Sequence, residues 1–142
     1  MTNSGGVAST VGDLMHPDPI VVLADAPLAE AARLLDRHRI GGLPVVDATG
    51  MLVGVVSQTD LLRARVTEHL WANWPGLAVR HLMTSPAITV RPSLPIPAAA
   101  RLMERERVHR LVVVDEDDER VPIGILSTGD LVHAMTGAPA DG

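Results

Sequence analysis

Leu43-Pro-Val-Val-Asp47 recurs 68 residues later as Leu111-Val-Val-Val-Asp115. From position 11 to the end of this stretch, 16 of the 37 positions from 11 to 47 are identical to their partners from 79 to 115. Downstream, the two copies shift by two residues within an acidic turn, where insertions are well tolerated. The copies align again after that turn, so the chain is an internal duplication of one unit of roughly 60 residues.

Each copy predicts the same order of elements: strand, helix, strand, strand, helix. Leu28, Ala31 and Leu35 recur at helical spacing, and Asp25 with Pro27 is typical of a polar cap followed by a proline in the first turn. The glycine pair 41–42 is expected to end this helix. The expected strands are 20–22, 43–46, 52–56, 88–90, 111–114 and 123–126. The expected helices are 28–38, 57–66, 96–107 and 128–135, preceded by a short helical turn at 13–15.

The length of the unit predicts how the two copies are arranged. A unit of this size is at the lower limit of independent stability, and two copies can cover each other's exposed faces. We therefore expect an α/β (α+β) protein whose two repeats pack about a pseudo-twofold axis, with two related clefts between them. The expected boundaries are 9–70 for repeat 1, 71–78 for a linker and 79–136 for repeat 2, with flexible tails at 1–8 and 137–142.

The composition excludes several kinds of chemistry. The chain has no Cys, and all twelve basic residues are Arg. A disulfide, a thiolate zinc site, a P-loop lysine and a Schiff-base lysine are therefore excluded. A net charge of −5 argues against a general nucleic-acid binder, and no apolar run is long enough to span a bilayer. The N-terminal residues lack a signal-peptide pattern, so we expect a cytoplasmic protein with neither a nucleic-acid nor a membrane partner.

No catalytic motif is present in the sequence. The six His residues are scattered, and neither a His-Glu-x-x-His nor a Gly-x-Ser-x-Gly pattern occurs. The acidic run 115–119 is typical of a solvated turn, with a cation site as the alternative. Trp71 and Trp74 lie in the linker and are interpreted as a lid over apolar surface, with contact to a second copy or a partner, or stacking on a purine, as the alternatives. We expect neither enzymatic activity nor a metal site.

The most informative motif follows the third strand of each copy, as Gly54-Val-Val-Ser57-Gln-Thr-Asp60 and Gly124-Ile-Leu-Ser127-Thr-Gly-Asp130. A hydroxyl leaves the strand and a carboxylate follows at the opening of a helix, whose free N–H groups and dipole favour a phosphate. The carboxylate can accept two hydrogen bonds from a ribose diol. The alternative is simple helix capping, because Ser, Thr and Asp are ordinary N-cap residues.

A second motif, Val108-His109-Arg110, stands just before the strand at 111–114. Arg binds phosphate bidentately, so this pair could neutralise a phosphate. The alternative is a solvated basic pair at the carboxyl end of a helix, where positive charge is favourable. The matching residues of the first copy are Gly41 and Gly42, so the two copies differ in charge at this place.

The duplicated unit, the Met15 and Met83 segments that lead into each copy, and the two Gly-x-x-Ser-x-x-Asp motifs resemble a tandem pair of cystathionine-β-synthase (CBS) domains, a Bateman module. The resemblance covers nearly the entire chain. The stretch 108–115 is similar to the His-Arg segment that binds phosphate in the γ subunit of AMP-activated protein kinase. The resemblance implies that an adenosine ligand (AMP, ADP, ATP or S-adenosylmethionine) binds between the repeats and that no other cofactor is required.

The same resemblance implies a role for each candidate residue. Asp60 and Asp130 would hold ribose hydroxyls, and the backbone around Ile20 and Ile88 would meet the adenine edge. A hydroxyl at the cleft would come from Thr84, whose counterpart in the other copy is His16. The remaining candidates would lie near phosphate or ribose: Ser57, His109, Arg110, Ser127 and Thr128.

These observations predict a stand-alone sensor that binds an adenine nucleotide and changes shape or oligomeric state for a separate, unidentified partner protein. The alternative is an interaction module that dimerises and contacts proteins without a ligand. Members of the family pair through helix faces, and the helical segments 28–35 and 61–66 carry enough apolar surface for that. We therefore expect a homodimer.

Overall fold

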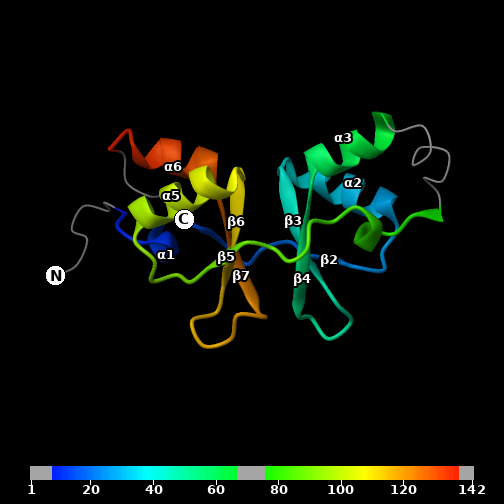
Figure 1. Ribbon diagram of the computed structural model, residues 1–142, viewed down its shortest axis with the longest axis horizontal. Helices are drawn as coiled ribbons and strands as arrows, with labels where there is room; N and C mark the ends of the chain where they lie inside the picture. The colour runs from blue at the N-terminus through cyan, green and yellow to red at the C-terminus, as the bar shows by residue number, and fades with distance from the viewer. Residues whose placement is uncertain (1–7, 67–75, 138–142) are drawn as a thin grey trace. The chain divides into compact units, whose positions relative to one another are not determined.

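The computed structural model describes residues 8–66 and 76–137, which form two compact units (Figure 1). One unit, here called the Asp60 unit, contains the described residues between 20 and 87. The other, the Asp130 unit, contains the described residues between 88 and 137 together with those before 20. The segment that leads into each sequence copy therefore packs with the other copy. The expected linker and tails, with Trp71 and Trp74, lie largely outside the described residues.

The Asp60 unit has a sheet in the order β2-β3-β4. Strand β2 (Val22–Leu23) is parallel to β3 (Gly42–Val46), and β3 is antiparallel to β4 (Leu52–Ser57). Helices α2 (Leu28–His38) and α3 (Gln58–Val66) contact each other and the sheet. The leading segment contributes the 3-10 turn η3 (Val79–His81).

The Asp130 unit has a sheet in the order β1-β7-β6-β5. Strand β5 (Thr89–Val90) is parallel to β6 (Arg110–Val114), which is antiparallel to β7 (Pro122–Ser127). Helices α5 (Ile96–Glu106) and α6 (Thr128–Ala134) contact each other. The leading segment adds helix α1 (Val11–Leu14) and strand β1 (His16–Pro17), which pairs with β7.

Each unit has its own aliphatic core. In the Asp60 unit, the α2 residues Leu28 and Leu35 are buried against Leu43 of β3 and Val56 of β4. The core also includes Val79 of the leading segment, which is 0% exposed. The Asp130 unit repeats this arrangement, with the core residues Val11, Leu14, Ala99, Met103, Leu111, Val113 and Leu126.

The backbone contacts of the two leading segments are equivalent. Val79 N donates to Ala26 O at 2.8 Å, and Arg80 N donates to Ala24 O at 2.9 Å. The matching pairs in the other unit are Val11 N to Leu94 O and Gly12 N to Pro92 O, each at 2.9 Å. Each copy therefore packs with the leading segment of the other copy, through the same kind of backbone hydrogen bonds.

The element order agrees with the sequence prediction, but some of the details were wrong. The prediction that Asp25 caps α2 was wrong, because Pro27 is the N-cap and makes no side-chain cap. Asp25 instead accepts a hydrogen bond from Arg80 Nη1 at 2.6 Å. The helix ends at His38 as expected, but its C-cap is Arg39 in the left-handed region rather than the glycine pair, and Arg107 caps α5 in the same way. Strand β1 was not predicted, and β2 lies about two residues later than expected.

Candidate functional site

In both units the Ser-x-x-Asp motif forms a reciprocal cap at the start of a helix. At α6, Ser127 N donates to Asp130 Oδ2 at 2.7 Å, and Asp130 N donates to Ser127 Oγ at 3.2 Å. At α3, Asp60 Oδ2 accepts from Ser57 N at 2.8 Å and from Ser57 Oγ at 3.0 Å. Both motifs therefore form the helix caps that the sequence offered as the alternative. The cap uses Oδ2 and holds each carboxylate in a fixed orientation, while Oδ1 takes no part in it.

The Oδ1 atoms of the two carboxylates have different neighbours. Asp60 is 7% exposed, and its Oδ1 lies 3.5 Å from Arg63 Nη1 on the same helix, the outer limit of hydrogen bonding. The side chain of Asp130 is 13% exposed, and its Oδ1 lies 2.8 Å from His16 Nε2. His16 is 114 residues away in the sequence and reaches Asp130 because the leading segment is exchanged. The sequence analysis identified His16 only as the counterpart of Thr84.

The leading segments lie at the same register in both units. Thr84 forms an antiparallel bridge with Val55 of β4, with hydrogen bonds of 2.8 and 3.0 Å. His16 of β1 stands opposite Ile125 of β7. Since Val55 and Ile125 are two residues before the motif serines, Thr84 and His16 occupy equivalent places beside the two motifs.

The glycine of each motif makes room for the leading segment. A Cβ built on Gly54 would lie 2.7 Å from Thr84 O and 2.9 Å from Met83 Sδ. A Cβ on Gly124 would lie 2.6 Å from Met15 Sδ and 3.0 Å from His16 O. The spacing from glycine to carboxylate is the same in both copies. The glycine of each motif therefore allows the leading segment to pack closely in the same motif that supplies the carboxylate.

Within its own unit, the basic pair lies beside the Ser127 motif. Arg110 stands directly opposite Ser127 in the β6–β7 ladder, so their side chains share one face of the sheet. The corresponding residue opposite Ser57 is Gly42. His109 is exposed, and its carbonyl accepts the N–H of Thr128 at 2.9 Å. The structure thus brings Arg110, Ser127 and Asp130 into the same unit.

The expectation of free N–H groups at the helix starts was only partly correct. In α6, Thr128 N donates to a carbonyl and Asp130 N donates to Ser127 Oγ. In α3, Gln58 N donates to Gly41 O at 2.9 Å and Asp60 N donates to Ser57 Oγ at 3.2 Å. Two of the first three N–H groups of each helix are therefore engaged, so a phosphate would depend mainly on side chains.

Ile20 and Ile88 are half-buried and pack against the core of their own unit. The carbonyl of Ile88 accepts a hydrogen bond from Val112 N at 3.2 Å, so this backbone group is already engaged. The Asp60 unit thus holds the candidates Ile20, Ser57, Asp60 and Thr84. The Asp130 unit holds the other candidates Ile88, His109, Arg110, Ser127, Thr128 and Asp130, with His16 as an addition.

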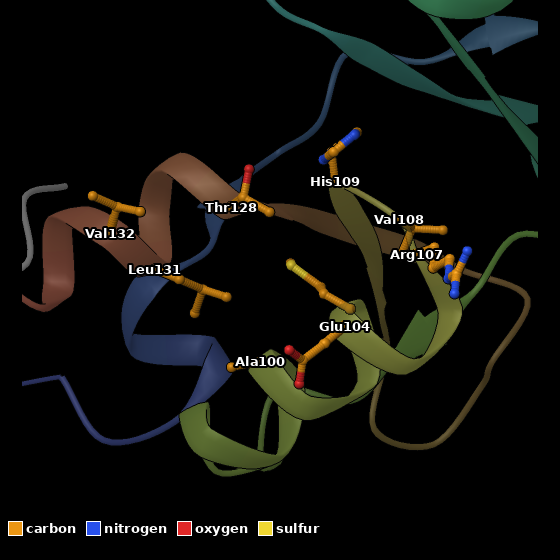
Figure 2. Close-up of a pocket in the computed structure, with 9 residues that line it drawn as sticks. Ala100, Glu104, Arg107, Val108, His109, Thr128, Leu131 and Val132 are labelled. Carbon is orange, nitrogen blue, oxygen red and sulfur yellow. The ribbon is translucent and has the colours of Figure 1, made fainter.

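A groove of about 500 Å³ lies between α5 and α6 (Figure 2). Ala100 and Glu104 line it from α5, and Leu131 and Val132 line it from α6. Of the candidates, only His109 and Thr128 contribute to its lining, and the ring of His109 points away from the two helices. This groove is therefore distinct from the place where His16 meets Asp130.

Within residues 8–66 and 76–137, no group of three or more His, Cys, Asp or Glu side chains could hold a metal ion. In the same part of the chain, no helix has the length and apolar character needed to cross a membrane.

Comparison with known proteins gives a consistent result. A family model described as the CBS domain matches residues 11–67 and 79–137. The uncharacterized protein MJ1426 of Methanocaldococcus jannaschii is 32% identical over 94% of this chain and 95% of its own length. The CBS domain-containing protein CBSX2, chloroplastic, of Arabidopsis thaliana is 35% identical over 88% of this chain and 63% of its own length. Other relatives are much longer, and the chain spans 24% of the γ-3 subunit of 5′-AMP-activated protein kinase from Sus scrofa.

Solved structures share the same fold. CBSX2 in complex with AMP superposes with a TM-score of 0.77 at 37% identity, covering 92% of this chain and 98% of that chain. The CBS domain pair of protein MJ0100, in complex with 5′-methylthioadenosine and S-adenosyl-L-methionine, gives a TM-score of 0.80 at 27% identity, covering 90% and 96%. The CBS-domain protein ATU1752 from Agrobacterium tumefaciens gives 0.81 at 27% identity, covering 95% and 99%.

Proposed function

Because this chain belongs to the CBS domain family and carries two copies of the domain, we propose that it is a regulatory module that binds an adenine nucleotide. The observation that carries the proposal is the capped carboxylate in each unit. Its Oδ2 is fixed by the motif serine, while its Oδ1 has no part in the cap. A carboxylate held in this way is ready to accept a hydrogen bond from a ribose hydroxyl at little cost in side-chain entropy.

The choice of ligand is supported by the related structures. CBSX2 was crystallised with AMP, and the MJ0100 pair with 5′-methylthioadenosine and S-adenosyl-L-methionine. These ligands share adenine and a ribose with a substituent at its 5′ position. An adenosine with a 5′ substituent is thus the ligand class that we propose for this chain, with AMP, ADP, ATP and S-adenosylmethionine as the members to test.

Within this proposal, Asp60 and Asp130 accept ribose hydroxyls. Arg110 supplies the positive charge for a 5′-phosphate, because it shares a sheet face with Ser127. The other candidates contribute hydroxyls, an imidazole and apolar contacts to the same ligand: Ile20, Ser57, Thr84, Ile88, His109, Ser127 and Thr128. The role is regulatory rather than catalytic. It requires a ligand that favours one conformation or oligomeric state over another.

The proposal is tested by calorimetry and thermal shift with AMP, ATP, S-adenosylmethionine and adenosine. A ligand at 100 times its dissociation constant stabilises the folded state by about 2.7 kcal/mol. Asp60→Asn and Asp130→Asn keep an oxygen for the cap but remove the charged acceptor, and each should weaken its own site by about tenfold or more. Asp36→Asn, an exposed position on α2, is the matched control. A nucleotide response that survives both motif substitutions would disprove the ribose assignment.

A further variant in the same experiment tests whether Arg110 binds the phosphate of the ligand. Arg110→Ala should weaken ATP and AMP more than adenosine, since only the first two carry a phosphate. Equal losses for ATP and adenosine would remove Arg110 from the phosphate site while leaving the carboxylate sites standing.

A second candidate function is favoured by exposed apolar side chains on the last helix of each unit. On α3, Leu62 and Val66 are 65% and 75% exposed, and on α6, Val132 is 62% exposed. These positions fit a homodimer that signals to a separate protein without a ligand. Sedimentation of the wild type with and without nucleotide separates the two candidates. A dimer that forms regardless of nucleotide, with no thermal shift, favours the second.

We propose the cytoplasm as the location of the protein, which cell fractionation would test.

A further inference from the structure

We propose that His16 lowers the affinity of the Asp130 unit for a ribose diol, so that the two carboxylate sites bind nucleotide unequally. This inference rests on the proposed function, because it takes a ribose as the group that Asp130 accepts. His16 is then a specificity-determining residue supplied by the leading segment rather than by the motif itself.

The geometry places His16 in direct competition with a ligand. Its Nε2 lies 2.8 Å from Asp130 Oδ1, the carboxylate oxygen that takes no part in the helix cap. Because of this contact, the carboxylate already has a hydrogen-bond partner before any ligand arrives. The carboxylate side chain is 13% exposed, whereas the imidazole is 73% exposed. A ribose hydroxyl that bonds to Oδ1 competes with the imidazole nitrogen for the lone pairs of that oxygen.

The Asp60 unit supplies the natural comparison. Thr84 takes the backbone register that His16 has in the other unit, but among the described residues its hydroxyl makes no hydrogen bond with Asp60. The Oδ1 of Asp60 has Arg63 Nη1 at 3.5 Å, a long contact to a 68% exposed side chain. Displacing such a contact costs less than displacing the 2.8 Å contact of His16, because 3.5 Å is at the outer limit of hydrogen bonding. Ligand binding at Asp60 is therefore less hindered than at Asp130.

The size of the effect follows from the kind of contact that is lost. A short hydrogen bond to a charged carboxylate is stronger than one between neutral groups, but solvent exposure of the imidazole reduces its net contribution. We expect His16 to lower the affinity of the Asp130 site by roughly five- to tenfold. His16 is the first residue of the two-residue strand β1, and its effect is exerted at the carboxylate oxygen that it contacts.

The test isolates one site at a time and uses AMP as the probe. In an Asp60→Asn background only the Asp130 site remains intact, and His16→Thr should tighten AMP binding by roughly five- to tenfold. In an Asp130→Asn background the reciprocal change Thr84→His should weaken AMP binding by a similar factor. His38→Thr, an exposed histidine at the end of α2, serves as the matched control and should leave both affinities unchanged.

The possible outcomes separate this inference from the proposed function. If both Asp→Asn changes reduce AMP binding but His16→Thr leaves the Asp130 site unchanged or weaker, this inference is overturned and the proposed function stands. A weaker site would mean that His16 contacts the ligand itself. If AMP binds neither the wild type nor the His16→Thr variant, both are overturned. An imidazole signal of His16 that shifts on adding AMP, and stays unshifted in the Asp130→Asn variant, supports displacement.

Discussion

At the scale of single residues, the two motif glycines stand where a side chain has no room. A Cβ on Gly54 would meet the carbonyl oxygen of Thr84 at 2.7 Å, so the backbone of the leading segment would have to move. A Cβ on Gly124 meets Met15 Sδ first, at 2.6 Å, and a flexible methionine can shift. The cost of adding a methyl group should therefore differ between the two copies.

We expect Gly54→Ala to lower the free energy of unfolding by about 2 kcal/mol, and Gly124→Ala to cost less, because overpacking usually costs 1–3 kcal/mol. Urea denaturation measures both changes. Gly129→Ala is the matched control: its Cβ would lie 3.6 Å from Ser127 Oγ, and Ala favours a helix. Equal costs at positions 54 and 124, or a comparable loss at 129, would contradict the steric explanation.

Asp13 shows how the leading segment responds to pH. Its Oδ2 accepts from Ser9 N, Ser9 Oγ and Thr10 N at 3.0 to 3.1 Å. These hydrogen bonds, the one from Ser9 N first, lower the pKa of Asp13 from 3.8 to about 2. A carboxyl whose pKa is lower in the folded state stabilises that state above pH 3.8. The stabilisation is lost as the pH falls towards 2.

The Asp13→Asn variant should therefore be less stable than the wild type at neutral pH, and the difference should shrink between pH 4 and pH 2. Chemical denaturation at several pH values measures this difference. Asp36→Asn controls for the change in net charge. A difference that stays constant across this range would show that the carboxylate of Asp13 contributes nothing through its charge.

At the scale of elements, the helices and the longer strands could be predicted from the sequence. The spacing of Leu28, Ala31 and Leu35 predicts the buried face of α2, and all three are buried. Strand β1 escaped prediction because two residues, one of them Pro17, carry no periodic pattern. The start of α2 at Leu28 was predicted correctly, but its cap was not, because Asp25 has a tertiary partner in Arg80, which competes with local capping.

The same limit applies to the candidate site. The reciprocal caps of Ser57 with Asp60 and of Ser127 with Asp130 are local and could be predicted from four consecutive residues. The contact of His16 with Asp130 spans 114 residues, and a sequence pattern carries no such distance information. Comparison of the two copies was the available signal, since the shift that aligns Met15 with Met83 also aligns His16 with Thr84.

At the scale of the whole molecule, the sequence repeat and the compact unit contain different residues. Val79 belongs by sequence to the second copy, yet it is fully buried in the core formed by the first. Val11 is fully buried in the core formed by the second copy. Each core therefore depends on a side chain from the other copy, which makes the duplicated chain, rather than the single repeat, the unit that folds.

This dependence predicts crossed effects on local stability. Val79→Ala should destabilise the chain by about 2 kcal/mol through the cavity it leaves, and should raise amide exchange in β3 and β4. Val11→Ala should instead raise exchange in β6 and β7. Hydrogen exchange read by mass spectrometry distinguishes the two patterns in the 142-residue chain. Each variant serves as the control for the other. If Val79→Ala loosened β6 and β7 while β3 and β4 kept their protection, the exchange of leading segments would be wrong, and with it the placement of His16 beside Asp130.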